Sequence, residues 1–158
     1  MKEAQKSFMQ QAIDLSREGM NTGKGGPFGC VIVKDERVVG KGCNSVSSTN
    51  DPTAHAEIVA IRDACKNMNV FQLQGCELYT SCEPCPMCLG AIYWARPDRV
   101  FFANDKTDAA EAGFDDYFIY QELTLPLLER KIPMKQLILG DAKEVFREWL
   151  AKSDKTPY

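Results

Sequence analysis

The chain has 158 residues, of which 44% are hydrophobic and 26% charged, a composition that suits one soluble globular domain and is short for two. Its 19 basic and 22 acidic residues give a net charge of −3, so it lacks the basic surplus that nucleic-acid-binding proteins usually carry. Its longest apolar runs are far too short to span a bilayer, and its polar first residues do not resemble a secretory signal, so we expect a cytoplasmic protein.

The first fifty residues are expected to form a helix and a hairpin. Residues 3–19 should be helical, because their apolar residues recur at helical spacing and Gly19 suits the C-terminal end. The glycine-rich turn at 23–29 lacks the Lys-Ser/Thr ending of a phosphate-binding loop. Two apolar runs around a polar tripeptide, residues 30–33 and 37–40, predict a β-hairpin.

A second helix is expected to start at Asp51, which would act as its cap, and to have Pro52 in its first turn. It would end at about Asn67. The residues expected on its buried face are Ile58, Ile61 and Cys65.

Strands and helices then alternate to the end of the chain. The expected elements are a strand at 77–80, a helix at 86–95, a strand at 99–103, a crossover through 107–132, a strand at 135–139 and a helix at about 142–152. This order implies an α/β domain with one mixed sheet and helices on both faces, formed by residues 1–158 as a single domain. Because the crossover exceeds a dozen residues, the last strand should pair parallel to its neighbour.

Two short segments contain residue types that could carry chemistry. His55, the sole histidine, lies two residues before Glu57 at one expected helix start, and Cys85 and Cys88 lie at the next. Two thiolates and one imidazole are preferred ligands of zinc, and three protein ligands leave the fourth tetrahedral position open for water. The pattern therefore predicts a catalytic zinc site between two helix N-termini.

Plainer interpretations of these residues remain open. A lone histidine is most often a core or surface residue, and a lone Cys-x-x-Cys is often redox-active or structural. Cys82 could supply a fourth ligand to a structural zinc, although Cys85 and Cys88 lie one helical turn apart and Cys82 precedes that turn. The total of seven cysteines, an odd number, indicates reduced thiols rather than a disulfide framework.

Glu57 is the expected acid and base of such a site. The positive end of the helix dipole would favour the thiolates of Cys85 and Cys88. Glu57 would take a proton from the activated water, pass it to a ring nitrogen and later to the leaving amine; the alternative is an ordinary exposed glutamate. His-x-Glu with Pro-Cys-x-x-Cys is the signature of zinc-dependent nucleobase deaminases, so the expected reaction removes an amino group from a nucleobase.

Longer stretches of sequence around these motifs resemble a known family. Residues 50–57 and 80–97 resemble both bacterial guanine deaminases and bacterial tRNA adenosine deaminases of the cytidine-deaminase-like superfamily. Residues 107–116 and the terminal Tyr158 resemble the guanine deaminases in particular. The whole chain is thus similar to bacterial guanine deaminases, and the resemblance implies hydrolysis of free guanine to xanthine and ammonia in purine catabolism.

The resemblance also implies a fold and a set of partners. The implied fold is a three-layer α/β/α sandwich with a central mixed five-stranded sheet. The implied partners are one Zn²⁺ per subunit, a purine base and a second copy of the chain. The two copies would form a homodimer that exchanges C-terminal segments of about residues 140–158. Neither nucleic acid nor a membrane is an expected partner.

Substrate contacts follow from the same resemblance. Asn44 would hydrogen-bond the base, Asp116 would read the guanine edge, and Tyr158 of the second subunit would cover it. The rings of Phe28 and Trp94 would flank the base. The backbone amide of Ala56 would also face it.

Each of these contacts has a plainer alternative. Asn44 could be a turn residue, and Phe28 and Trp94 could be core aromatics. Asp116 could be a solvated acid, with Asp115 as the alternate reader, and chain ends are often disordered. For the whole chain, tRNA adenosine deamination is the nearest alternative function, which the net charge of −3 disfavours, and a zinc-stabilised binding module is the alternative outside the enzymes.

Overall fold

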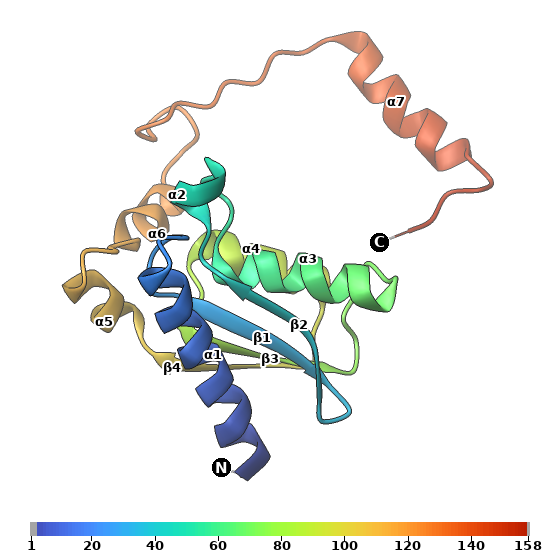
Figure 1. The fold of residues 1–158 in the computed structure, drawn as a ribbon. Helices are drawn as coiled ribbons and strands as arrows, with labels where there is room; N and C mark the ends of the chain where they lie inside the picture. Colours follow the sequence, from blue (N-terminus) through green and yellow to red (C-terminus); the bar gives the residue numbers. More distant parts are fainter. Residues whose placement is uncertain (1–2, 158) are drawn as a thin grey trace. The chain divides into compact units, whose positions relative to one another are not determined.

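The computed structural model describes residues 3–157, and the chain separates into two units, residues 1–116 and 117–158 (Figure 1). The first unit contains the expected N-terminal helix, the hairpin and both candidate metal-binding segments. Among residues 3–157, none of the helices combines the length and the apolar character needed to cross a bilayer.

A mixed sheet with the strand order β2-β1-β3-β4 forms the centre of the first unit. β1 (Gly29–Lys34) pairs antiparallel with β2 (Arg37–Cys43) and with β3 (Cys76–Cys82). β3 pairs parallel with β4 (Arg99–Asn104). The carboxyl ends of β3 and β4 therefore meet at one edge of the sheet, next to the start of β1.

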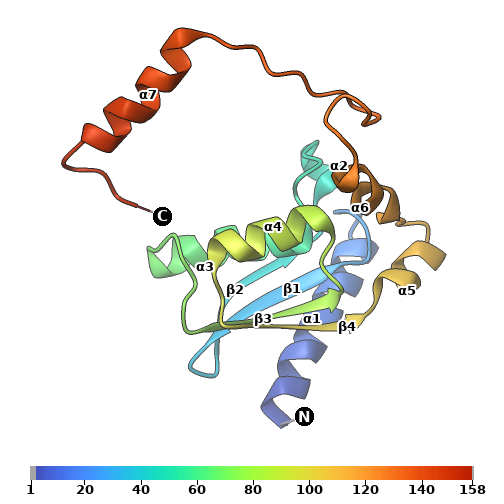
Figure 2. The same ribbon diagram turned by 180° about the vertical axis from the view of Figure 1, so that it is seen from behind.

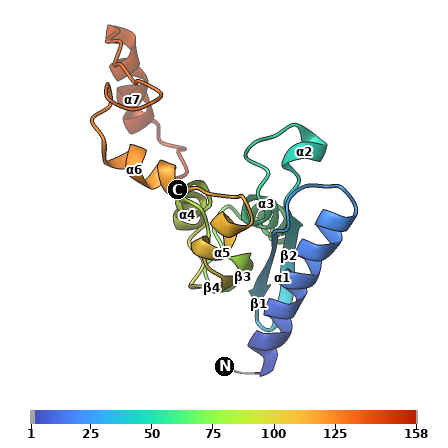
Figure 3. The same ribbon diagram turned by 90° about the vertical axis from the view of Figure 1, so that its left-hand side faces the viewer.

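Helices cover both faces of this sheet, which confirms the predicted α/β/α layers. α1 (Glu3–Asn21) packs on one face, and α3 (Ala56–Met68) and α4 (Pro86–Ala95) cover the other, as the edge-on view shows (Figure 3). Seen from behind, α3 and α4 run side by side across the sheet (Figure 2).

Because both faces are covered, the central strands carry buried apolar residues on both sides. In β1, Val31 and Val33 belong to the apolar cluster beneath α1, whereas Cys30 and Ile32 belong to the cluster beneath α3 and α4. This division follows the two-residue period of a strand, in which successive side chains point to opposite faces.

α3 lies very close to the sheet at its N-terminal end. A β-carbon on Gly42 would lie 2.6 Å from the carbonyl oxygen of Ala56, so only glycine allows this approach. The predicted buried face of the helix is confirmed, since Ile58 is buried and Ile61 and Cys65 pack partly buried against the core.

The start of α3 differs from the prediction. Asp51 does not cap the helix, because its Oδ1 accepts hydrogen bonds from the backbone amide and the hydroxyl of Thr53, at 2.8 and 2.6 Å, and so closes a turn. His55 is the N-cap instead. A short helix that was not predicted, α2 (Val46–Thr49), precedes this turn. As a result, Glu57 lies in the first helical turn, beside the cap residue.

The segment after β4 contains helices within the predicted crossover, and the final helix predicted at about 142–152 is confirmed. α5 (Lys106–Glu111) belongs to the first unit, and α6 (Tyr117–Thr124) and α7 (Gly140–Ala151) belong to the second.

Residues 135–139 form no strand, so the prediction of a five-stranded sheet is wrong for the single chain, whose described sheet has four strands. The side chains of Leu137, Ile138 and Leu139 are 82%, 78% and 74% exposed. A strand needs a neighbouring strand for its backbone hydrogen bonds, and the described part of the second unit supplies none.

Candidate active site

Two helix starts bring together the three expected metal ligands. His55 is the N-cap of α3, Cys85 is the N-cap of α4, and Cys88 lies in the first turn of α4. The Nδ1 atom of His55 lies 3.5 Å from the Sγ atoms of both cysteines, and the three ligand atoms all lie within 4.8 Å of one another. Zinc with bonds of about 2.0–2.3 Å in tetrahedral geometry requires ligands at such separations, so these residues fit the metal.

The electrostatics of the site favour a thiolate at Cys85. Contacts with Cys88, through its side chain and its backbone amide at 3.5 Å, and with His55 hold the pKa of Cys85 at about 4, far below the ordinary value of 9.0. The same pairing, together with burial, raises the pKa of Cys88, and the hydrogen bond to Cys85 raises the pKa of His55. In the metal-free chain Cys88 keeps its proton, and a divalent cation would displace it.

Cys82 does not join this group. Its Sγ lies 3.5 Å from the backbone oxygen of Asp105, and burial raises its pKa to about 11, so it stays a neutral thiol. The metal-binding group found among residues 3–157 contains His55, Cys85 and Cys88 only. Three ligands with an open fourth position are typical of catalytic zinc, which argues against the structural alternative.

Glu57 lies inside the protein, next to the ligands. Its side chain is 5% exposed; Thr80 Oγ1 donates to its Oε1 at 3.1 Å, and Cys88 Sγ lies 3.4 Å from its Oε2. Burial is the main cause that raises the pKa of its carboxyl group. A buried carboxyl group with a raised pKa, next to the metal ligands, suits proton transfer, so Glu57 is not the ordinary exposed glutamate of the alternative interpretation.

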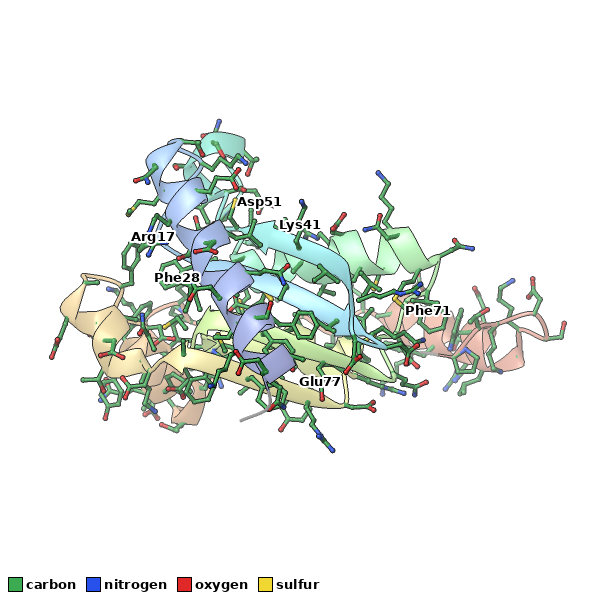
Figure 4. The ribbon with its side chains drawn as sticks, turned by 60° about the horizontal axis from the view of Figure 1, so that its bottom comes forward. Arg17, Phe28, Lys41, Asp51, Phe71 and Glu77 are labelled. Carbon is green, nitrogen blue, oxygen red and sulfur yellow. The ribbon has the colours of Figure 1, made fainter. Side chains whose placement is uncertain are left out.

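A cavity of about 110 Å³ opens beside Glu57, at the edge of the sheet where β3 and β4 end. This volume is well below the roughly 300–1,000 Å³ of drug-sized sites and suits one small planar molecule. In Figure 4, Phe28 marks this end of the sheet and Glu77 lies towards the other end. The lining residues are Phe28, Asn44, His55, Glu57, Cys82, Glu83, Cys85, Lys106, Ala109, Phe114 and Asp116.

Asn44 presents a fixed hydrogen-bonding group to the cavity. It is 7% exposed, and its Oδ1 accepts hydrogen bonds from the backbone amides of Gly26 at 3.2 Å and Val46 at 3.3 Å. Since two N–H donors need an oxygen acceptor, the amide can have only this orientation. Its NH₂ group is therefore the part that can donate to a ligand.

Aromatic and acidic side chains complete the cavity wall. The rings of Phe28 and Phe114 meet edge to face, with their centroids 4.9 Å apart. Asp116 lines the cavity, and burial raises the pKa of its carboxyl group. Asp115, the alternative to Asp116 for contacting the guanine edge, is exposed.

The other expected contacts lie elsewhere. Trp94 is 64% exposed on α4, Ala56 is fully buried, and neither lines the cavity. Tyr158 lies outside the described residues. Sequence reasoning missed Thr80 and Phe114; Phe114 lies within the stretch 107–116 that carried the family resemblance, so a signal for it existed, whereas Thr80 is recognised only from its contact with Glu57.

Comparison with known proteins links this geometry to a family. Residues 2–104 match the model of the cytidine and deoxycytidylate deaminase zinc-binding region. The chain is 56% identical to a guanine deaminase of Bacillus subtilis, over 96% of this chain and 97% of that protein. It is 34% identical to a tRNA-specific adenosine deaminase of Aquifex aeolicus, over 92% and 93%. The X-ray structure of a Bacillus subtilis guanine deaminase superimposes with a TM-score of 0.96 at 54% identity, over 100% and 99% of the two chains.

Proposed function

This chain belongs to the cytidine and deoxycytidylate deaminase zinc-binding family, and from this we propose that it is a guanine deaminase, which hydrolyses guanine to xanthine and ammonia. High identity to a guanine deaminase along almost the whole chain supports the choice of substrate. The observation that carries the proposal is the composition of the cavity, in which Glu57 adjoins His55 and Cys85 while Asn44 and Asp116 line the same small space.

The metal of this enzyme is zinc, which His55, Cys85 and Cys88 would hold. When bound, zinc acts as a Lewis acid that activates the attacking water. The low pKa of Cys85 supports this assignment, because a thiolate is the form of cysteine that binds metal.

In the proposed mechanism Glu57 moves the protons. Its Oε1 is engaged by Thr80, so Oε2, on the side of the metal ligands, is the oxygen that exchanges the proton. Oε2 would accept a proton from the attacking water and return it to a ring nitrogen of guanine. A second transfer, to the amino group on C2, would release ammonia and leave xanthine.

Recognition of the base would rest on buried polar pairs. The NH₂ group of Asn44 would donate to an acceptor of the purine, and the Asp116 carboxylate would accept from ring and amino N–H groups, with Phe28 against the ring. A site of this kind strongly rejects analogues that leave its polar groups unpaired. The Ala56 amide and the Trp94 ring remain proposed contacts.

A panel of substrates tests the proposal. Purified zinc-loaded protein would be given guanine, guanosine, adenine, cytosine and a tRNA, and xanthine, inosine and ammonia would be measured. We expect xanthine and ammonia in equal amounts from guanine and much slower turnover of the others. Absence of xanthine would contradict the proposal, and inosine formed in tRNA would favour the tRNA deaminase alternative.

We also propose that the enzyme is a cytoplasmic homodimer in which C-terminal segments of about residues 140–158 are exchanged. All seven cysteines are free, which fits a reducing compartment. In α7, large apolar side chains are exposed, among them Phe146 and Leu150, and such groups usually need cover. Light scattering should give a dimer. Deleting Pro157 and Tyr158 should lower activity, and full activity would remove Tyr158 from the site.

A further inference from the structure

The end of β3 and the residue after it hold the start of α5 through three contacts. The backbone amide of Glu83 donates to the carbonyl oxygen of Asn104 at 2.8 Å. The thiol of Cys82 donates to the carbonyl oxygen of Asp105 at 3.5 Å. The backbone amide of Lys106 donates to Glu83 Oε2 at 3.1 Å. We call these contacts of Cys82 and Glu83 with residues 104–106 the clasp.

The contact of Glu83 with Lys106 satisfies an amide that α5 does not satisfy by itself. The first amides of a helix have no partner within the helix. Asp105 Oδ1 accepts from the amides of Thr107 and Asp108 at 2.8 and 3.1 Å, and Asp108 Oδ2 accepts from the amide of Asp105 at 2.9 Å. The amide of Lys106 is bonded from outside, by Glu83. A helix of six residues is marginal on its own, and this contact adds to the Asp105 capping box in holding the start of α5 in place.

α5 leads into one wall of the cavity. Ala109 lines the cavity, and its carbonyl oxygen accepts a hydrogen bond from the amide of Phe114 at 2.9 Å. Phe114 contacts the ring of Phe28, and Asp116 follows two residues later. We call these three cavity-lining residues, Ala109, Phe114 and Asp116, the base-reading wall.

We propose that Glu83 is a positioning residue, which sets the base-reading wall relative to the zinc ligands through its bond to the Lys106 amide. Glu83 lies two residues before Cys85, so the clasp joins the loop that carries a metal ligand to the wall that carries Asp116. Glu83 therefore determines how tightly guanine binds and leaves the chemical step unchanged. The inference rests on the proposed function, since guanine is the ligand concerned.

Substitutions of Glu83 give the first test. Glu83→Ala removes the acceptor, and we expect KM for guanine to rise about tenfold, the equivalent of one hydrogen bond to a charged group, while kcat stays within about threefold. Glu83→Gln keeps an oxygen acceptor and should stay within about threefold of the wild-type KM. All variants should retain one zinc per subunit. Glu111→Ala, at the exposed end of the same helix, is the control and should match wild type.

The donor side of the same bond gives a second, independent test. Lys106→Pro removes the amide N–H, and proline is well tolerated at the first position of a helix. Asp105 already has φ −93° and ψ 177°, the extended conformation that a residue before proline prefers. Lys106→Ala loses the same side chain but keeps the amide. We expect KM to be about tenfold higher for Lys106→Pro than for Lys106→Ala, and we expect the double variant Glu83→Ala/Lys106→Pro to be no worse than either single variant.

Three results would overturn the inference: equal KM values for Lys106→Pro and Lys106→Ala, loss of zinc in Glu83→Ala, or a fall in kcat with KM unchanged. These outcomes are separate from failure of the proposed function. If the wild type binds guanine but forms no xanthine, the deaminase proposal fails, and the same variants then test the clasp through the dissociation constant of guanine.

Discussion

Glu57→Gln isolates proton transfer from every other role of this residue. Glutamine has the size of glutamate, its amide oxygen can accept the hydrogen bond from the Thr80 hydroxyl, and its NH₂ group can face Cys88 Sγ. The cavity and the zinc ligands should therefore keep their positions. The one property that is lost is the ability to take up and return a proton at neutral pH.

The expected loss is a fall in kcat of about 10²- to 10⁴-fold, the usual contribution of a general acid or base. This corresponds to about 2.7–5.4 kcal/mol of activation free energy. The stability of the variant should not fall together with its activity. Burial raises the folded-state pKa of Glu57 above 4.5. The stabilisation from its protonated form is complete below that ordinary value and is lost as pH rises through the raised pKa. At neutral pH the metal-free variant should therefore melt no lower than metal-free wild type.

The assay measures xanthine formation, zinc content by elemental analysis and thermal melting on the same preparations. Glu111→Gln, an exposed substitution on α5, serves as the control. If Glu57→Gln retains zinc and its kcat stays within tenfold of wild type, Glu57 is not the proton carrier. If the variant loses zinc, the residue acts in metal retention and the mechanism above is wrong.

Three further predictions concern recognition, metal and pH. Asn44→Asp keeps an acceptor for the Gly26 and Val46 amides but loses the NH₂ donor, so KM for guanine should rise about tenfold with little change in melting temperature. Asn44→Ala removes the acceptor as well, so it should also lower the free energy of unfolding by about 1–3 kcal/mol. A strong chelator should abolish guanine hydrolysis and lower the melting temperature, and added zinc should restore both; activity in metal-free protein would contradict the site. The pKa of Cys82 is about 11 in the folded chain, so the stability that it contributes is complete below 9.0 and is lost as pH rises through about 11. Between pH 9 and 11, the free energy of unfolding should therefore fall less for Cys82→Ser than for wild type, as measured by denaturant titrations. An equal fall in both proteins would contradict the raised pKa of Cys82.

The metal ligands and the order of the layers could be predicted because both follow from residue patterns within short stretches of sequence. His55 and Cys85 each begin a helix, and the spacing of Cys85 and Cys88 is one helical turn, so a short stretch of sequence specifies each half of the site. The alternation of apolar residues in β1 likewise needs no knowledge of its neighbours.

What sequence reasoning missed depends on contacts between distant segments. Asp51 followed by proline is equally compatible with a helix cap and with the turn that it forms with Thr53, and the close approach of α3 at Gly42 fixes where that helix starts. Residues 135–139 have the apolar character of a strand but pair with no strand in the described chain. Glu83 has no pattern of its own, because its role follows from an amide 23 residues away.

The metal site and two of the proposed base contacts come from different stretches of the chain. The metal ligands, Glu57 and Thr80 all precede the end of β4, while Phe114 and Asp116 come from the short stretch that follows it. Both stretches meet because parallel strands finish at the same edge of a sheet. Substitutions in this stretch can therefore change the base contacts proposed for Phe114 and Asp116, while the metal ligands, Glu57, Asn44 and Phe28 keep their positions.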